Sequence, residues 1–282
     1  MIDLHLHTTA SDGRLTPKQL VEAAKKRGLK AIAITDHDTV DGVQEALDNA
    51  EGIEVIPGIE ISCYEKGYPE VHILGYFIDH NDPKLLAFTK KLRQERLDQK
   101  KAMIIELNKM GYDITYEEVL KKVGTSFGRP HIAQALVEKY PKKFRDIRDV
   151  FKQVLFTGGP AYVEREESTS MSEAIAQVKA AGGIPILAHP GAYPKFNALK
   201  LIRWFKREGG MGIETYYPYY YKFPRLALSR VLNKGLVRYF RSIAKKEKLL
   251  ETGGSDYHDG DMLDLKIPDS VLEKLKVRLS CR

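Results

Sequence analysis

The sequence predicts an α/β fold, in which a barrel of short strands with helices outside it is interrupted by a helical insertion. Short apolar runs alternate with helical patterns in the first 80 residues and again after residue 160, which is the rhythm of βαβ units. Between these parts, residues 81–160 carry helical patterns and no convincing strand. A chain of 282 residues has room for both, because single barrels commonly run to about 200–250 residues.

The first part of the chain contains four predicted strands and two predicted helices. The first helix begins at Thr16, an N-cap residue followed by Pro17, and ends at Gly28. A second helix is expected at Val43–Ala50. The strands are expected at Met1–His7, Ala31–Thr35, Ile53–Ile61 and Val71–Phe77.

The central segment is expected to form a separate helical domain. Turn signals mark both of its ends, at Asn81-Asp82-Pro83 and at Gly158-Gly159-Pro160. We therefore assign residues 1–80 and 161–282 to the barrel and residues 81–160 to a helical cap. Helices are expected in the cap at Pro83–Met110, Tyr116–Val123, Pro130–Tyr140 and Asp146–Phe156.

The barrel pattern resumes after residue 160. Helices at Ser172–Ala181 and Asn197–Glu208 are followed by strands at Ile184–Ala188 and Met211–Thr215, and a final helix leads to a strand at Leu249–Thr252. Seven strands are therefore predicted in all.

Composition favours a cytoplasmic protein. No stretch approaches the roughly 20 apolar residues that span a bilayer, and Met1 leads directly into a strand rather than into a signal segment. Cys63 and Cys281 are too few for a disulfide framework or a thiolate metal site, which fits a reducing compartment.

Nine side chains of types that bind divalent metals lie mostly at the ends of apolar runs. Residues i and i+2 of a strand point to the same face, so His5 and His7 can bind one ion together. Asp256 and His258 can do the same if they continue the last strand. A lone histidine beside an apolar run is more often a core or surface residue, but six of the chain's eight histidines occupy such positions. The predicted ligands are His5, His7, Asp12, His37, Glu60, His72, His189, Asp256 and His258.

At these residues the chain resembles the PHP (polymerase and histidinol phosphatase) phosphoesterases. The matching motifs, in order, are His5-x-His7-Thr-x-x-Ser-Asp12-Gly13, Thr35-Asp-His37-Asp, Gly58-Ile-Glu60, Ala188-His189-Pro190-Gly191 and Gly254-Ser-Asp256-Tyr-His258. Val71-His72-Ile-Leu-Gly75-Tyr and Gly128-Arg129-Pro-His131 resemble the branch active on nucleotides and short RNA. The resemblance implies a distorted (β/α)7 TIM-like barrel with a helical insertion.

The resemblance also implies how the ligands are shared among three divalent ions. These would be held by His5, His7, Glu60 and Asp256, by Glu60, His72 and His189, and by Asp12, His37 and His258. Histidine and carboxylate ligands without thiolates suit Mn²⁺, Fe²⁺ or Zn²⁺. Ions about 3.5–4 Å apart can activate a shared water, so that a bridging hydroxide attacks phosphorus in line. Glu60, Asp256, His258 and Arg129 are the expected catalytic residues.

Charge is distributed unevenly along the chain. Residues 81–160 have net charge +7 and residues 195–248 have +11, whereas the remainder, which carries the ligands, has −11. Basic segments beside an acidic metal core are expected for a polyanionic substrate, although most single lysines simply solvate helices. Arg129 is expected to bind phosphate through its two-pronged guanidinium, with an ion pair at the helix cap as the alternative. His131 is expected to contact phosphate, to replace His72 as a ligand, or to cap its helix.

Four further residues carry open alternatives. Tyr216 and Tyr217 are candidate platforms for a nucleobase, a stacking contact worth about 1–3 kcal/mol per base, or else they pack the barrel rim. Asp36 and Asp38 either orient His37 or cap the following helix, and the residue types do not separate these roles.

The predicted function is that of a metal-dependent phosphohydrolase acting on nucleotides or short RNA. It would be a nucleoside 3′,5′-bisphosphate or mononucleotide phosphatase, or a 5′-3′ exoribonuclease on short RNA. One alternative is a small-metabolite phosphatase such as histidinol phosphatase, and another is a non-catalytic nucleic-acid-binding module with structural metals. No membrane association and no protein partner is implied.

Overall fold

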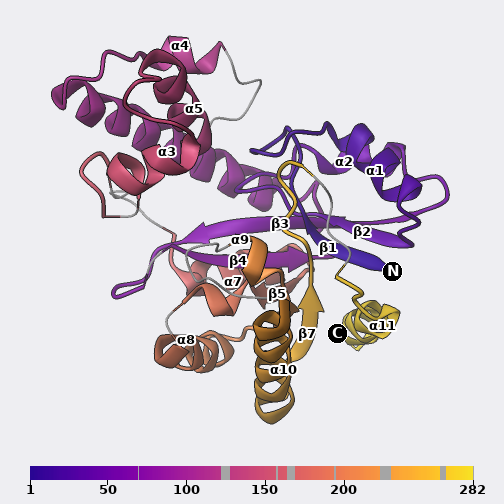
Figure 1. Cartoon of the computed structure of the whole chain (residues 1–282). Helices are drawn as coiled ribbons and strands as arrows, with labels where there is room; N and C mark the ends of the chain where they lie inside the picture. The colour runs from indigo at the N-terminus through magenta and orange to yellow at the C-terminus, as the bar shows by residue number, and fades with distance from the viewer. Residues whose placement is uncertain are drawn as a thin grey trace. The chain divides into compact units, whose positions relative to one another are not determined.

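The computed structural model describes residues 1–68, 70–121, 128–156, 158–163, 169–193, 195–222, 230–260 and 265–281. The chain forms two compact units, one of Met1–Thr89 with Thr169–Arg282 and one of Lys90–Ser168. All the strands found in the described ranges belong to the first unit (Figure 1). Among the helices of those ranges, none has the length and apolar character that crossing a membrane requires.

Within the described residues, seven strands form one sheet in sequence order from β1 to β7. They are β1 (Ile2–Leu6), β2 (Ala31–Ile34), β3 (Glu54–Cys63), β4 (Val71–Tyr76), β5 (Ile184–Leu187), β6 (Gly212–Tyr216) and β7 (Leu250–Gly253). A parallel bridge between Leu6 and Tyr257 joins the two edges, so the sheet curls toward closure. The seven expected strands are all present within a few residues of their predicted bounds.

One strand departs from the expected parallel barrel. β4 pairs antiparallel with both β3 and β5, whereas the other neighbours pair parallel. The expectation of seven βα repeats is therefore wrong here, because residues 64–70 connect β3 to β4 and are too few for a crossover helix. Because β4 runs in the opposite direction, its N-terminal end, where His72 pairs with Ser62, lies at the rim where the parallel strands end.

Helices surround the sheet of the first unit. They are α1 (Pro17–Lys26), α2 (Val43–Asp48), α7 (Met171–Ala180), α8 (Lys195–Arg207), α9 (Tyr219–Lys222), α10 (Arg230–Glu247) and α11 (Asp269–Ser280). A capping box at Thr16 starts α1, which buries Leu20, Val21 and Ala24. The sequence did not predict α11, whose Val271 and Leu272 pack into the same core cluster as the strand residues Leu4 and Ile186.

The second unit is helical where it is described. α3 (Pro83–Lys109) enters it, followed by α4 (Tyr116–Leu120), α5 (Arg129–Lys139), α6 (Ile147–Val150) and a π-helical turn at Phe151–Leu155. The hydrophobic core of this unit includes Met103, Leu107, Ile132, Leu136 and Phe144. The predicted end of the second cap helix, Val123, lies outside the described residues.

Candidate metal centre

All nine predicted ligands belong to the first unit, and their side chains form one cluster at a rim of the sheet. Their ligand atoms form three groups, and within each group all the atoms lie within 4.8 Å of one another. The groups are His5, His7, Glu60 and Asp256; His37, Glu60 and His72; and His7, Asp12, His37 and His258. The first group equals the expected set, the second contains His37 where His189 was expected, and the third gains His7.

Glu60 is the centre of this cluster. It lies in β3 with no exposed surface. Its Oε2 atom is 3.2 Å from Nε2 of both His5 and His7 and 3.0 Å from Nδ1 of His37. Its Oε1 atom is 2.9 Å from Nδ1 of His72 and 3.2 Å from Nε2 of His189. One carboxylate therefore touches five imidazoles, including that of His189, which lies outside the three groups.

Five of the ligands reach the rim because they lie at or just beyond the ends of strands. His5 and His7 close β1, His37 and His189 follow β2 and β5, and His72 begins the reversed strand β4. This explains why ligands far apart in the sequence share one centre.

Asp256 and His258 arrive by a route that differs from the prediction. They do not continue a strand, because β7 ends at Gly253 and Asp256 has a φ of +52°. The two side chains still meet, with His258 Nδ1 3.3 Å from Asp256 Oδ1, while His258 Nε2 is 3.3 Å from Asp12 Oδ1. A loop, rather than a strand face, brings them together.

Close backbone packing permits this approach. A Cβ atom at Gly254 would overlap the backbone of His5, so a glycine is required where the loop after β7 passes β1. The contact brings Asp256 Oδ1 within 3.1 Å of His7 Nε2.

Backbone strain is concentrated at the same rim. Six described residues other than glycine have positive φ, and three of them, Asp38, His189 and Asp256, belong to or adjoin the cluster. Such conformations cost on the order of 1–3 kcal/mol each and persist where the surrounding structure enforces them. The fold therefore tolerates local strain in order to aim these side chains.

Asp36 and Asp38 each form hydrogen bonds that hold a segment of the site. Asp36 accepts hydrogen bonds from the Thr8 amide at 2.7 Å and from the Ser11 hydroxyl at 2.5 Å, so it fixes the loop that carries Asp12. Asp38 accepts a hydrogen bond from the Ser62 amide at 2.8 Å and thereby ties the segment after β2 to β3.

Glu214 is a buried residue of this site that sequence reasoning missed. It lies in β6 with no exposed surface. Its Oε1 is 3.0 Å from Nδ1 of His5, and its Oε2 accepts a hydrogen bond of 2.8 Å from the His189 amide. An acidic residue inside the apolar run Gly212–Tyr216 was the available signal.

Of the two alternatives considered for Tyr216 and Tyr217, their contacts favour packing over base stacking. Tyr217 is 2% exposed and donates a 2.6 Å hydrogen bond to Asp256 Oδ2, so no ring face is open to a base. Tyr216 packs against the core cluster that contains Leu4 and Ile186, and the Arg241 guanidinium lies 5.3 Å from its ring centre. Tyr217 is therefore a support for a ligand, and Tyr216 is a packing residue.

Arg129 and His131 lie at the start of α5 in the second unit. The Arg129 guanidinium is 5.6 Å from the ring centre of Tyr162 and 6.0 Å from that of Phe151. His131 Nδ1 accepts a 2.9 Å hydrogen bond from the Gly128 amide, which caps the helix. The capping role considered for His131 is present, and its other ring nitrogen carries the proton when the imidazole is neutral.

The electrostatics of the cluster suit cations. Burial alone would lower the pKa of His7, but contacts with Asp256 and Glu60 outweigh it and raise that pKa to about 9. Burial likewise opposes charge on Glu60, yet the surrounding imidazoles, His37 and His5 foremost, hold its pKa well below the usual range. The Glu60 carboxylate is thus ionised, and its negative charge favours bound cations.

Several potential metal-ligand atoms of the cluster are buried without a hydrogen-bond partner among the described residues, which fits a bound metal ion. His5 Nε2, His7 Nε2, Asp12 Oδ1 and Glu60 Oε2 are buried and form no hydrogen bond with the described part of the chain. Buried polar atoms without such partners are costly, whereas divalent ions bind nitrogen and oxygen atoms converging in this way.

Removing metal should make stability fall as pH rises. The pKa of His7 is about 9 in the folded protein and about 6.5 in an unfolded chain, so proton binding stabilises the fold fully below pH 6.5. This contribution, about 3 kcal/mol for His7, is lost as pH rises through 9. Urea unfolding in EDTA at pH 6, 7.5 and 9 measures it. With saturating Mn²⁺ the trend should reverse, because metal replaces the protons; constant stability in EDTA would contradict the prediction.

An α/β fold with a curled sheet and a buried cluster of histidines and carboxylates at one rim is typical of a metal-dependent enzyme. The PHP domain family matches residues 3–177 of this chain. A protein from Bifidobacterium adolescentis, assigned as a metal-dependent phosphoesterase, superposes with a TM-score of 0.80 at 30% identity, covering 98% of this chain and 96% of that one. The chain therefore belongs to the PHP domain family and is a metal-dependent phosphoesterase.

Three relatives are named for different phosphate esters. A 3′,5′-nucleoside bisphosphate phosphatase of Chromobacterium violaceum is 36% identical over 220 residues, 76% of each chain. A 5′-3′ exoribonuclease of Haemophilus influenzae is 38% identical over 218 residues, 75% of this chain and 77% of the relative. A phosphoribosyl 1,2-cyclic phosphate 1,2-diphosphodiesterase of Eggerthella lenta is 31% identical over 267 residues, 91% of this chain and 93% of the relative.

Proposed function

We propose that this protein hydrolyses phosphate esters of nucleotides, as a nucleoside 3′,5′-bisphosphate or mononucleotide phosphatase or as a 5′-3′ exoribonuclease on short RNA. The observation that carries the hydrolytic part is the single carboxylate of Glu60 in contact with five imidazoles. Two relatives named for nucleotide and RNA substrates support the choice of substrate.

The three donor groups would hold up to three divalent ions. His5, His7, Glu60 and Asp256 supply one set, His37, Glu60 and His72 a second, and His7, Asp12, His37 and His258 a third. Bound ions would neutralise charge on phosphoryl oxygens and lower the pKa of water, which makes a nucleophile available near neutral pH.

The chain's own residues supply orientation and charge balance. Glu214 accepts from Nδ1 of His5 and so directs Nε2 of that ring toward Glu60 and Asp256. Tyr217 fixes the second oxygen of Asp256. Asp36 holds the loop before Asp12. His5, Asp256 and Asp12 are thus positioned before substrate arrives.

Arg129 is proposed to bind a substrate phosphate. Its guanidinium can donate two parallel hydrogen bonds to phosphate oxygens, and Phe151 and Tyr162 restrict its motion. The net charge of +7 in residues 81–160 would favour approach of a polyanion.

Phosphate release by the Mn²⁺-loaded protein tests the proposal. The panel is adenosine 3′,5′-bisphosphate, AMP, a 5′-phosphorylated trinucleotide, histidinol phosphate and phosphoribosyl 1,2-cyclic phosphate. We expect turnover of at least one nucleotide substrate to exceed that of the last two compounds. Arg129→Met should raise KM about tenfold with less effect on kcat, since hydrogen bonds to charged groups contribute about 1.5–3 kcal/mol. Preference for histidinol phosphate or the cyclic phosphate would overturn the choice of substrate, and binding of RNA without turnover would overturn hydrolysis.

A further inference from the structure

A pocket lies at the other end of the strands from the metal centre. Its volume is about 750 Å³, and Met211 and Leu250 form part of its apolar lining. Met211 precedes β6 and Leu250 begins β7, whereas the metal ligands gather at the opposite rim, where β1, β2 and β5 end. At roughly 3.3 Å per strand residue, the pocket and the cluster are separated by about 15 Å. A molecule in this pocket would therefore not reach the cluster of metal-ligand residues.

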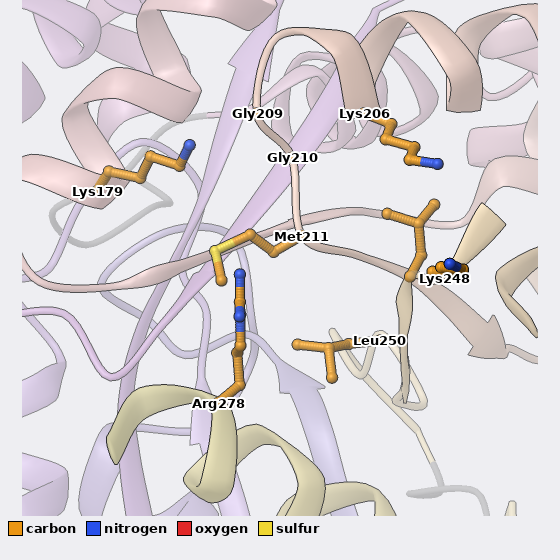
Figure 2. A pocket seen from close by; sticks show the side chains of 9 residues that line it. Lys179, Lys206, Gly209, Gly210, Met211, Lys248, Leu250 and Arg278 are labelled. Atoms are coloured by element: carbon orange, nitrogen blue, oxygen red, sulfur yellow. The ribbon is translucent and has the colours of Figure 1, made fainter. Parts of the chain in front are cut away.

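Four cations from four parts of the fold line this pocket. Lys179 belongs to α7, Lys206 to α8 and Arg278 to α11, while Lys248 follows α10. Figure 2 shows Lys179 and Arg278 pointing toward the segment Gly209–Met211. Among the described residues that line the pocket, none is acidic. The pocket is consequently a site of positive potential.

The protein itself offers these cations few carboxylate partners. Lys206 is 3.4 Å from Glu247, which also pairs with Arg203. Within the described ranges of the chain, no carboxylate comes within ion-pair distance of Lys179, Lys248 or Arg278. Positive charge at the pocket is therefore largely uncompensated by the described part of the protein.

The helix dipole explains why cations lie at these helix ends, but it does not explain why they line the same pocket. Cations in the last turn of a helix interact favourably with the helix dipole, by about 0.3–1 kcal/mol each, and Lys179, Lys206 and Arg278 occupy such positions. That effect acts wherever a helix ends, as at Lys26 of α1. It gives no reason for four helix ends to direct cations at one cavity.

The backbone at Lys248 points independently to the same pocket. The helices α7, α8 and α10 end in the same hydrogen-bond pattern, with a left-handed residue at Gly182, Gly209 and Lys248 respectively. Glycine is favoured there, and another residue costs about 1–2 kcal/mol. Of these three helix ends, the one without glycine at this position carries a lysine that lines the pocket.

We propose that this pocket binds a small anion bearing two or more phosphoryl groups. The uncompensated cations supply charge, and the volume lies in the range of small-molecule sites. Aromatic side chains, on which single-stranded nucleic acids stack, are absent from the described lining residues. A compact polyphosphate matches these features better than an RNA chain does.

Titration calorimetry with inorganic tripolyphosphate tests the proposal on the Mn²⁺-loaded protein. The double variant Lys179→Met/Arg278→Met should lose one binding event or weaken it at least about tenfold, because two charged contacts disappear. Its turnover of a phosphoester should equal that of the wild type. A matched control, Lys26→Met/Arg207→Met, removes two cations from helix ends outside the pocket and should bind tripolyphosphate as the wild type does.

Three results would overturn the proposal. The first is unchanged tripolyphosphate binding in the Lys179→Met/Arg278→Met variant. The second is an equal loss of thermal stability in both double variants without any difference in anion binding, which would assign the cations to helix dipoles alone. The third is pocket-dependent binding of an unphosphorylated ten-nucleotide RNA without binding of tripolyphosphate, which would assign the site to a nucleic-acid backbone.

Discussion

Replacing Glu60 by alanine should abolish phosphoester turnover, with a loss of at least about a thousandfold in kcat/KM. Both carboxylate oxygens lie within 3.2 Å of histidine nitrogens, and Glu60 belongs to two of the three donor groups. Its removal takes a shared ligand from two donor groups and a negative charge from between five imidazoles, so that bound cations lose both a donor atom and charge compensation. Bound metal, measured by atomic emission after dialysis, should fall in parallel with activity.

The variant Glu54→Gln is the matched control for this experiment. Glu54 begins the same strand, but its side chain pairs with Lys276 at 2.8 Å near the surface. We expect its metal content and turnover to match those of the wild type. Full activity or full metal content in Glu60→Ala would contradict the assignment of Glu60 as the central ligand.

Replacing Glu214 by glutamine should weaken metal binding by about 10- to 100-fold, the usual effect of losing a partner that orients a ligand. Glu214 faces two nitrogens, Nδ1 of His5 and the amide of His189, and its two oxygens serve one each. Glutamine retains one acceptor and turns an amide donor toward the other nitrogen. The His5 ring then loses its fixed orientation toward Glu60.

Excess metal distinguishes positioning from general damage. If Glu214 acts through the ligands, saturating Mn²⁺ should restore much of the turnover of Glu214→Gln, whereas it should not rescue Glu60→Ala. Thr215→Val controls for disturbance of β6, because the Thr215 hydroxyl donates to the Thr252 carbonyl oxygen and does not contact a ligand. A Glu214→Gln protein with wild-type metal affinity would contradict this role.

Local sequence signals predicted much of the fold. The capping box at Thr16 and the seven apolar runs depend on neighbouring residues, so helix α1 and the strands could be recognised without tertiary information. The direction of β4 could not, because an apolar run is the same in either direction and only the short connection from Cys63 to Val71 decides it. The helix α11 was missed because its apolar face has meaning only against the core of the sheet.

The amino-acid sequence alone specified which residue types form the cluster, since nine histidines and carboxylates placed in order near strand ends are the donor set that a divalent metal site requires. The folded chain set how these ligands are shared and supported. Glu214 and Tyr217 contact His5 and Asp256 across distances of 209 and 39 residues, and the loop after Gly253, not a strand, delivers Asp256. Residue types and their positions along the chain predict the metal ligands. Hydrogen bonds between strands and loops depend instead on which segments lie side by side in the folded sheet.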